Sequence, residues 1–406
     1  MFLLDKMLRK IVRSGELTVV TADGRERRYG SPDPARAPVT IRFTDARAPD
    51  FIARHPRLGM GEAFMDGRVV VDRGDVVDLL DLIRSNVPWE RGGGIGGKRK
   101  IGKRLLGTVG RFNSLRASRR NVAHHYNLSD RLYDLFLDAD RQYSCAYFTD
   151  PTVPLERAQA DKKAHIAAKL ALAPGQRVLD IGCGWGGMAL YLNRVADVDV
   201  LGVTLSEEQL AVARRRAAEA GVADRVKFAL IDYRELDGRF DRIVSVGMFE
   251  HVGAPHYRRF FAKCRSLLAD DGVMLLHTIG RVGGPGATDA FTAKYIFPGG
   301  YNPALSEILG ASEAAGLITT DVETLRLHYA LTLEHWYDRT VAARAEIEAI
   351  YDERFYRLWT FYLAGAISAF RHGGLVNYQL AYAKSRDVPG NARAEIVAAE
   401  RHLRGA

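Results

Sequence analysis

Five short apolar segments alternate with helical patterns between residues 177 and 278, and no other feature of the sequence constrains the fold as strongly. Strands separated by helices in this way build a parallel sheet with helices on its faces. The expected strands are residues 177–181, 198–204, 226–230, 240–246 and 272–278. A later alternating stretch at 376–382 predicts a final strand with one face buried. We therefore predict an α/β fold for this part of the chain.

The first ninety residues differ from this pattern and predict a small α+β domain. They mix short apolar stretches such as 39–43 with turn residues, and they end in a helical repeat at 76–83. A glycine-rich, basic stretch follows, which is typical of a flexible connection. We place an amino-terminal domain at residues 1–95, a linker at 96–120 and a catalytic domain at 121–406.

The positive charge of the chain is concentrated in one window. Residues 91–120 contain ten of the 58 Arg and Lys residues and no Asp or Glu, so the remaining 48 bases face 49 acids. A basic segment in an otherwise neutral chain indicates an anionic partner, either a membrane surface or a nucleic acid. The window has almost no aromatic side chains on which bases could stack. We expect an anionic phospholipid membrane rather than nucleic acid; a solvated linker is the alternative.

No segment predicts a membrane span, a secretory signal or a metal site. The longest apolar run, near residues 358–370, is shorter than the roughly 18–20 residues that cross a bilayer. Asp5 and Lys6 interrupt the apolar start of the chain before a signal sequence can form. We therefore expect a cytoplasmic protein at the inner face of the membrane. The cysteines lack metal-ligand spacing, and their odd number does not form a complete disulfide set: Cys145, Cys183 and Cys264.

The segment VLDIGCGWGG, residues 178–187, predicts a nucleotide-containing ligand. Gly182, Gly184 and Gly187 satisfy the G-x-G-x-x-G pattern of dinucleotide sites, but that pattern alone is weak. Asp180 stands directly before the glycine turn, where its carboxylate would attract an ammonium group and repel a pyrophosphate. The amino-acid end of S-adenosylmethionine fits this charge, so we expect that cofactor.

The second predicted strand ends without the acidic residue that usually holds an adenosine ribose. This absence removes the anchor of a dinucleotide and also departs from most Rossmann-like methyltransferases. Thr204 and Gln209 would have to supply the polar contacts instead. Asp232 and Tyr233 follow the third strand, where we expect a hydrogen bond to the adenine and an aromatic wall beside it.

Five further motifs carry a resemblance to a known family: RQYSCAYF (141–148), GVTLSEEQ (202–209), SVGMFEHVG (245–253), HTIG (277–280) and KYIFPGGY (294–301). In these motifs and their order the chain resembles the cyclopropane-fatty-acyl-phospholipid synthases, including the mycolic acid cyclopropane synthases. GEAFMDGRVVVD at 61–72 resembles the amino-terminal domain of the phospholipid-acting branch. The resemblance implies a Rossmann-like class I methyltransferase fold and methylene transfer from S-adenosylmethionine to a cis double bond of a phospholipid acyl chain. It also implies a homodimer.

The family is understood to use a bound bicarbonate as base, and the resemblance implies its ligands here. They are the side chains or backbone of Cys145, Glu250, His277, Ile279 and Tyr329, while Tyr143 and Ser144 match positions that contact the cofactor. A carboxylate would repel bicarbonate unless a proton lay between them. We therefore infer that Glu250 accepts the bicarbonate hydroxyl proton.

Several alternatives stay open at this point. The same alkene methylation could end in a methylene or methyl-branched chain, and the basic linker could belong to an RNA or small-molecule methyltransferase. A lipid-binding protein without activity would not need the Asp180 loop. Taken alone, Cys145 could be a small core residue and His277 a core histidine. His251, next to Glu250, is interpreted as a structural hydrogen-bonding residue.

Overall fold

The computed structural model describes residues 1–91, 129–388 and 392–405. These residues form two compact units. The first comprises the described part of Met1–Lys103 with Asp289–Pro298 and Ala330–Gly374, and the second comprises the described parts of Arg104–Thr288, Gly299–Tyr329 and Leu375–Ala406. The predicted boundaries at residues 95 and 120 lie outside the described residues and stay predictions. The grouping of two later segments with the amino-terminal part was not indicated by the sequence.

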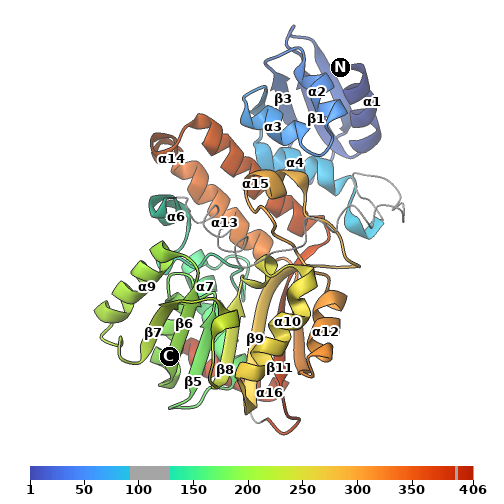
Figure 1. The fold of residues 1–406 in the computed structure, drawn as a ribbon. Helices are drawn as coiled ribbons and strands as arrows, with labels where there is room; N and C mark the ends of the chain where they lie inside the picture. The colour runs from blue at the N-terminus through green and yellow to red at the C-terminus, as the bar shows by residue number, and fades with distance from the viewer. Residues whose placement is uncertain (92–128, 389–391, 406) are drawn as a thin grey trace. The chain divides into compact units, whose positions relative to one another are not determined.

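The second unit contains a seven-stranded sheet in the order β10-β11-β9-β8-β5-β6-β7 (Figure 1). The strands from β9 to β7 are parallel to one another. Strand β11 pairs antiparallel with β9, and β10 pairs antiparallel with β11. The strands are β5 (Arg177–Ile181), β6 (Asp199–Thr204), β7 (Val226–Leu230), β8 (Phe240–Val246), β9 (Leu268–Arg281), β10 (Ile318–Leu325) and β11 (Leu375–Ala383). The predicted α/β class and its parallel sheet are confirmed.

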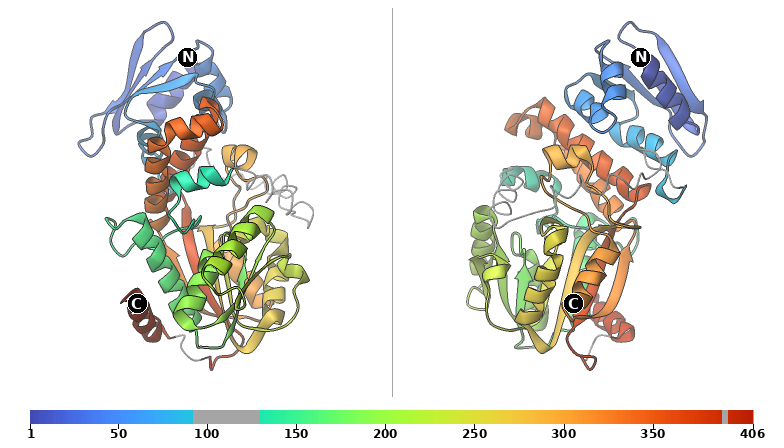
Figure 2. Two further views of the ribbon diagram at one scale, coloured as in Figure 1. Left: turned by 90° about the vertical axis from the view of Figure 1, so that its left-hand side faces the viewer. Right: turned by 45° about the vertical axis from the view of Figure 1, so that its right-hand side comes forward.

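The antiparallel strands differ from the expectation. We predicted that residues 376–382 bury one face, but every residue of β11 after Leu375 is buried. The physical reason is its position, since β11 lies inside the sheet between β9 and β10, and helices cover both faces of the sheet (Figure 2). Strand β10 was not predicted, because its sequence ITTDVETL is mostly polar and only Asp321 and Leu325 are buried.

Helices cover both faces of this sheet (Figure 2). Adjacent residues of β5 point to opposite sides, so that Val178 packs in one buried cluster with α8 and α9 while Leu179 packs in the other with α10. The helices of this unit are α6 (Asp130–Phe136), α7 (Leu155–Leu170), α8 (Gly187–Ala196), α9 (Glu207–Glu219), α10 (Tyr257–Leu267), α12 (Leu305–Ala314) and α16 (Arg393–Gly405).

The first unit is built on a four-stranded sheet in the order β2-β1-β3-β4. Its strands are β1 (Gly15–Val20), β2 (Glu26–Ser31), β3 (Val39–Phe43) and β4 (Val69–Arg73). Helices α1 (Phe2–Ile11), α2 (Ala48–Arg54), α3 (Gly59–Met65) and α4 (Val76–Ser85) accompany them. The mixture confirms the predicted α+β character of the amino-terminal part.

Helices from later in the chain complete this unit. They are α11 (Ala290–Tyr295), α14 (Arg344–Ile350), α15 (Glu353–Arg371) and the part of α13 (His328–Ala342) from Ala330 onward. The Phe361 ring of α15 lies 5.0 Å from the ring of Phe291 and 5.7 Å from that of Phe64. A Cβ atom at Gly61 would lie 2.5 Å from Phe291, so this packing requires glycine there.

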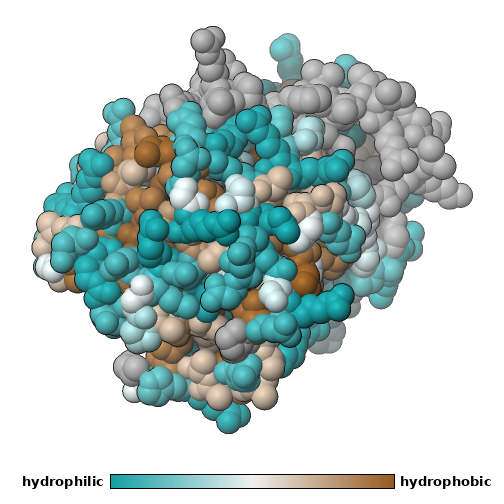
Figure 3. Space-filling view, turned by 60° about the horizontal axis from the view of Figure 1, so that its bottom comes forward, coloured by the Kyte–Doolittle hydropathy of each residue, from teal (hydrophilic) through white to brown (hydrophobic). Residues whose placement is uncertain are grey.

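None of the helices in the described ranges is long and apolar enough to cross a membrane. The face of the molecule drawn in Figure 3 carries mainly hydrophilic side chains, with apolar ones in separate patches. Apolar residues scattered in this way are ordinary on protein surfaces and do not by themselves mark a binding site.

Candidate cofactor and catalytic site

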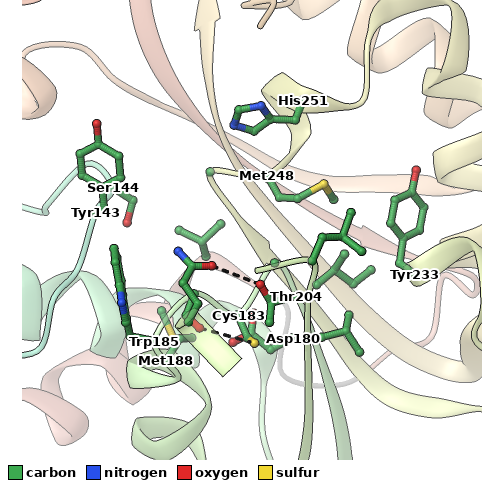
Figure 4. Close-up of a pocket in the computed structure, with 18 of the residues that line it drawn as sticks. Tyr143, Ser144, Asp180, Cys183, Trp185, Met188, Thr204, Tyr233, Met248 and His251 are labelled. Carbon is green, nitrogen blue, oxygen red and sulfur yellow. Dashed lines mark hydrogen bonds between the residues drawn. The ribbon is translucent and has the colours of Figure 1, made fainter. Parts of the chain in front are cut away.

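A cavity lies where the carboxyl ends of β5, β6, β7 and β8 meet (Figure 4). Ligands of open parallel sheets bind at this edge, because the loops that leave neighbouring strands diverge there. All nine predicted cofactor residues line this one cavity: Tyr143, Ser144, Asp180, Gly182, Gly184, Thr204, Gln209, Asp232 and Tyr233. The structure therefore brings them together, although their contacts with a cofactor stay predictions.

Asp180 is the most distinctive charged group of the cavity. Only 2% of the residue is exposed, and burial raises the pKa of its carboxyl group to about 7. Within the part of the chain that the structure describes, Oδ2 has no hydrogen-bond partner. A buried carboxylate without a partner is costly, so a ligand that brings an ammonium group to this oxygen would be stabilised.

The glycine-rich turn after β5 is held by backbone hydrogen bonds to β6. The backbone N–H groups of Gly182 and Cys183 both donate to the carbonyl of Val203, at 2.9 and 3.0 Å. Gly182 has a φ of 83°, and a Cβ atom there would lie 2.7 Å from that of Met248. Glycine is thus required by backbone conformation and by space.

The end of β6 presents hydroxyl and amide groups in place of the usual acid. The Thr204 hydroxyl donates to Oε1 of Gln209 at 3.1 Å, and Ser206 caps α9 by accepting from the backbone N–H of Gln209. Because Oε1 of Gln209 is engaged, the amide nitrogen is the donor that remains for a ligand hydroxyl. The roles of Thr204 and Gln209 in holding a ribose stay predictions.

Asp232 is held more firmly than the sequence indicated. Its two carboxylate oxygens accept from Nε and Nη2 of Arg234, at 2.8 and 2.6 Å, and one also accepts from the Arg234 backbone N–H. To accept a hydrogen bond from an adenine amino group, Asp232 would therefore have to use an oxygen that already accepts from Arg234. The neighbouring Tyr233 lies at the cavity edge in Figure 4.

Sequence reasoning did not single out Gln142, Trp185 or Met248, which also line the cavity. The Trp185 ring lies 5.0 Å from that of Tyr133 in α6. His251 lines the cavity as well, and burial lowers its pKa to about 4, so it is neutral near pH 7. These residues fall within or beside the motifs above, but nothing in a linear sequence indicates that they point inward.

Glu250 does not line this cavity, and it is a second buried acidic residue at the same edge of the sheet. It sits in the short helical turn η5 (Phe249–His251) after β8, and its Oε1 accepts from the backbone N–H of Ile279 at 2.6 Å. Burial raises the pKa of the Glu250 carboxyl group to about 7. Its Oε2 has no hydrogen-bond partner among the described residues. Two of the five predicted catalytic positions are therefore in direct contact.

His277, on β9, has both ring nitrogens occupied by side-chain amides of β11. The Asn377 amide lies 2.9 Å from Nε2, and the Gln379 amide lies 3.1 Å from Nδ1. A neutral ring accepts at one nitrogen and donates at the other, so one of the two amides presents its oxygen. Burial, with the nearby charges of Lys162 and Lys169, holds the pKa of His277 well below its usual range. His277 is thus neutral and oriented by the sheet.

The other two predicted catalytic residues are also buried. Cys145 is 1% exposed, and its thiol donates to the carbonyl of Ala146 at 3.4 Å. Tyr329 is 9% exposed and stands near the start of α13, at the end of a segment of the second unit.

Comparison with known proteins decides the family. The family model described as mycolic acid cyclopropane synthetase matches residues 113–380. A cyclopropane-fatty-acyl-phospholipid synthase of Escherichia coli is 40% identical, over 86% of this chain and 88% of its own. The chain belongs to the mycolic acid cyclopropane synthetase family. A "Probable fatty acid methyltransferase" of Pseudomonas putida is 42% identical over 80% of this chain and 82% of its own.

Solved structures agree with membership of the cyclopropane synthetase family. The cyclopropane synthase MmaA2 of Mycobacterium tuberculosis matches 66% of this chain and 98% of its own, with 36% identity and a TM-score of 0.63. Coclaurine N-methyltransferase, at 18% identity and a TM-score of 0.66, shares the fold alone. The predicted class I methyltransferase fold is confirmed, and this family member is an S-adenosylmethionine-dependent methyltransferase acting on unsaturated lipid acyl chains.

The burial of Asp180 predicts a pH-dependent affinity for S-adenosylhomocysteine, which carries the same ammonium group. The ammonium favours the ionised carboxylate, so affinity should rise as pH increases toward about 7. Below that pH the slope should approach roughly tenfold per unit. Titration calorimetry between pH 5.5 and 8.5 measures this slope, and Asp180→Asn should weaken binding and flatten it. A slope that persists in the folded variant would remove Asp180 from the site.

Proposed function

We propose that this enzyme transfers a methylene group from S-adenosylmethionine to the cis double bond of an unsaturated phospholipid acyl chain, forming a cyclopropane. The observation that carries this proposal is the Glu250 carboxylate, buried with one oxygen fixed by Ile279 and the other without a described partner. Methyl transfer alone needs no such group. Removal of a proton from the new methyl group, which ring closure requires, needs a positioned base.

The reaction requires two stages at one site. The alkene attacks the sulfonium methyl group, the carbon–sulfur bond breaks, and S-adenosylhomocysteine leaves as a carbocation forms on the acyl chain. Removal of a proton from the new methyl group then supplies the electron pair for the second carbon–carbon bond. Water would trap the cation, so burial of Cys145 and Glu250 suits the second stage.

Bicarbonate, when bound, would supply the base for that proton. Among the described residues Oε2 of Glu250 accepts no hydrogen bond and could accept from the bicarbonate hydroxyl, while the backbone N–H of Ile279 holds Oε1 in place. Cys145 and Tyr329 are the further proposed contacts. For His277 to bind the anion as well, the amide of Asn377 or Gln379 has to release its ring nitrogen. We therefore propose that His277 mainly shapes the site in its neutral form.

A methyl-branched or methylene product is the second candidate. A "Tuberculostearic acid methyltransferase UfaA1" of Mycobacterium tuberculosis is 34% identical over 92% of this chain and 89% of its own. Its name denotes a methyltransferase rather than a cyclopropane synthase. In the methylene route a hydride shift first moves the cation to the carbon that bears the new methyl group, and that methyl group then loses its proton. A methyl-branched chain needs a reductant in addition.

Deuterium labelling of the transferred methyl group distinguishes these products. With a donor that carries three deuterons and a monounsaturated phospholipid, ring closure should leave two deuterons in the product, as measured by mass spectrometry. A product that retains all three would contradict cyclopropane formation. A methylene product also keeps two deuterons, so mild catalytic hydrogenation is the control: the cyclopropane should resist it and an exocyclic alkene should add hydrogen.

We also propose peripheral association with an anionic membrane surface. Helix α1 exposes 78% of Phe2 and 48% of Leu3, and Lys6, Arg9 and Lys10 of the same helix are exposed as well. Apolar and basic side chains in combination favour the interface of an anionic bilayer. The basic window predicted to contribute lies almost entirely outside the described residues.

Neutralising five bases of that window tests its contribution: Lys98, Arg99, Lys100, Lys103 and Arg104. Each base near an anionic surface contributes about 1 kcal/mol, and physiological salt screens it beyond about 8 Å. Sedimentation with anionic vesicles should show weaker, less salt-sensitive binding for the variant, with unchanged affinity for S-adenosylhomocysteine. Equal binding of the wild type to neutral and anionic vesicles would leave the window as a linker.

A further inference from the structure

Lys162 of α7 is a buried cation directly behind the cofactor cavity. No part of the residue is exposed, and its Nζ donates to Oε1 of Gln142 at 2.7 Å and to Oγ of Ser144 at 2.8 Å. Both acceptors line the cavity. Gln159, nearly one turn earlier in α7, donates to the backbone carbonyls of the same two residues, each at 3.1 Å. Two side chains of one helix thus hold the segment that carries Gln142 and Ser144.

The charge of Lys162 is not neutralised as those of its neighbours are. Lys163 pairs with Asp140, and Lys169 pairs with Glu323, whereas among the described residues no carboxylate lies within ion-pair distance of Lys162. The charged or titratable groups that interact with it are Asp138, Asp140, Lys163, Cys145 and His277. Burial lowers the pKa of Lys162 to about 7. An anion on the cavity side of Ser144 would therefore favour the protonated form.

We propose that Lys162 is a positioning residue that prepares Ser144 to bind the carboxylate of the cofactor's amino-acid end. The ammonium form of Lys162 can only donate, so Oγ of Ser144 acts as acceptor and its own hydrogen is left to point elsewhere. Toward the cavity, that hydrogen can be donated to a carboxylate. The positive charge behind it attracts the same anion.

This inference rests on the proposed placement of S-adenosylmethionine. With the ammonium of its amino-acid end at Asp180, the carboxylate of the same amino-acid group needs a positively charged or hydrogen-bond-donating partner. Figure 4 shows Ser144 and Asp180 on the same cavity, with Tyr233 on its far side. Asp180 and the Lys162–Ser144 pair would then recognise the two charges of one amino-acid group, while the adenosine lies toward Tyr233.

A ligand without the amino-acid group separates this role from a structural one. S-Adenosylhomocysteine carries the carboxylate, whereas 5′-methylthioadenosine keeps the adenosine and the sulfur but lacks it. Lys162→Met removes the donor and the charge at similar side-chain length. Calorimetry should show about tenfold weaker binding of S-adenosylhomocysteine, as for loss of a charge-assisted contact, and less than twofold change for 5′-methylthioadenosine.

Lys169→Met is the matched control, because Lys169 is a buried lysine of the same helix without a hydrogen bond to the cavity-lining segment. It should leave both affinities unchanged. Ser144→Ala should reproduce the selective loss, and adding Lys162→Met to it should change little further. If Lys162→Met does not fold, Lys162→Gln, which retains one donor but no charge, should show the same ligand selectivity.

Equal weakening of both ligands by the Lys162 variant would overturn the proposal and leave Lys162 as a structural support. Unchanged affinity for both would overturn it as well. Failure of the wild type to bind S-adenosylhomocysteine would instead contradict the proposed cofactor site. The two failures are therefore distinguishable.

Discussion

The parallel pairing of β5 with β6 and β8 is the constraint on which the site depends. Parallel neighbours end at the same edge, so residues far apart in the sequence meet there without any long-range contact of their own. Asp180 arrives from β5, Thr204 from β6 and Glu250 from the turn after β8. The glycine turn after β5 then permits the backbone to bend away from the cavity without filling it.

Two carboxylates left partly unsatisfied define what this edge can bind. Asp180 and Glu250 each have a buried oxygen without a partner among the described residues, and burial raises the pKa of both to about 7. Such groups destabilise a fold unless a ligand satisfies them. A cation at Asp180 and a proton donor at Glu250 would do so, which matches the ammonium of the cofactor and the hydroxyl of bicarbonate. Lys162 is a buried positive charge behind the same cavity, and an anionic group of a ligand would be attracted to it.

The sequence predicted the parallel strands well because their apolar segments are short, buried and separated by helices. It did not predict β10, whose polar sequence reflects an edge position, and it underestimated the burial of β11. The glycine motif and the strand ends located most of the predicted residues that line the cavity, while Tyr143 and Ser144 came from the family resemblance. Lys162 could not be found in this way, since a lysine in a charged helix usually faces solvent, and its burial arises only when α7 packs against the segment at 142–144. The amides around His277 come from β11, a hundred residues further on.

Bicarbonate dependence of the Glu250→Gln variant tests the central claim most directly. In the variant the amide oxygen can still accept from Ile279, so the amide nitrogen takes the position of Oε2 and cannot accept a hydroxyl proton. Cyclopropane formation by the wild type should fall roughly a hundredfold or more when bicarbonate is removed and recover when it is restored. The variant should stay slow in both conditions while binding S-adenosylhomocysteine normally. A wild type that runs at full rate without bicarbonate would contradict the account.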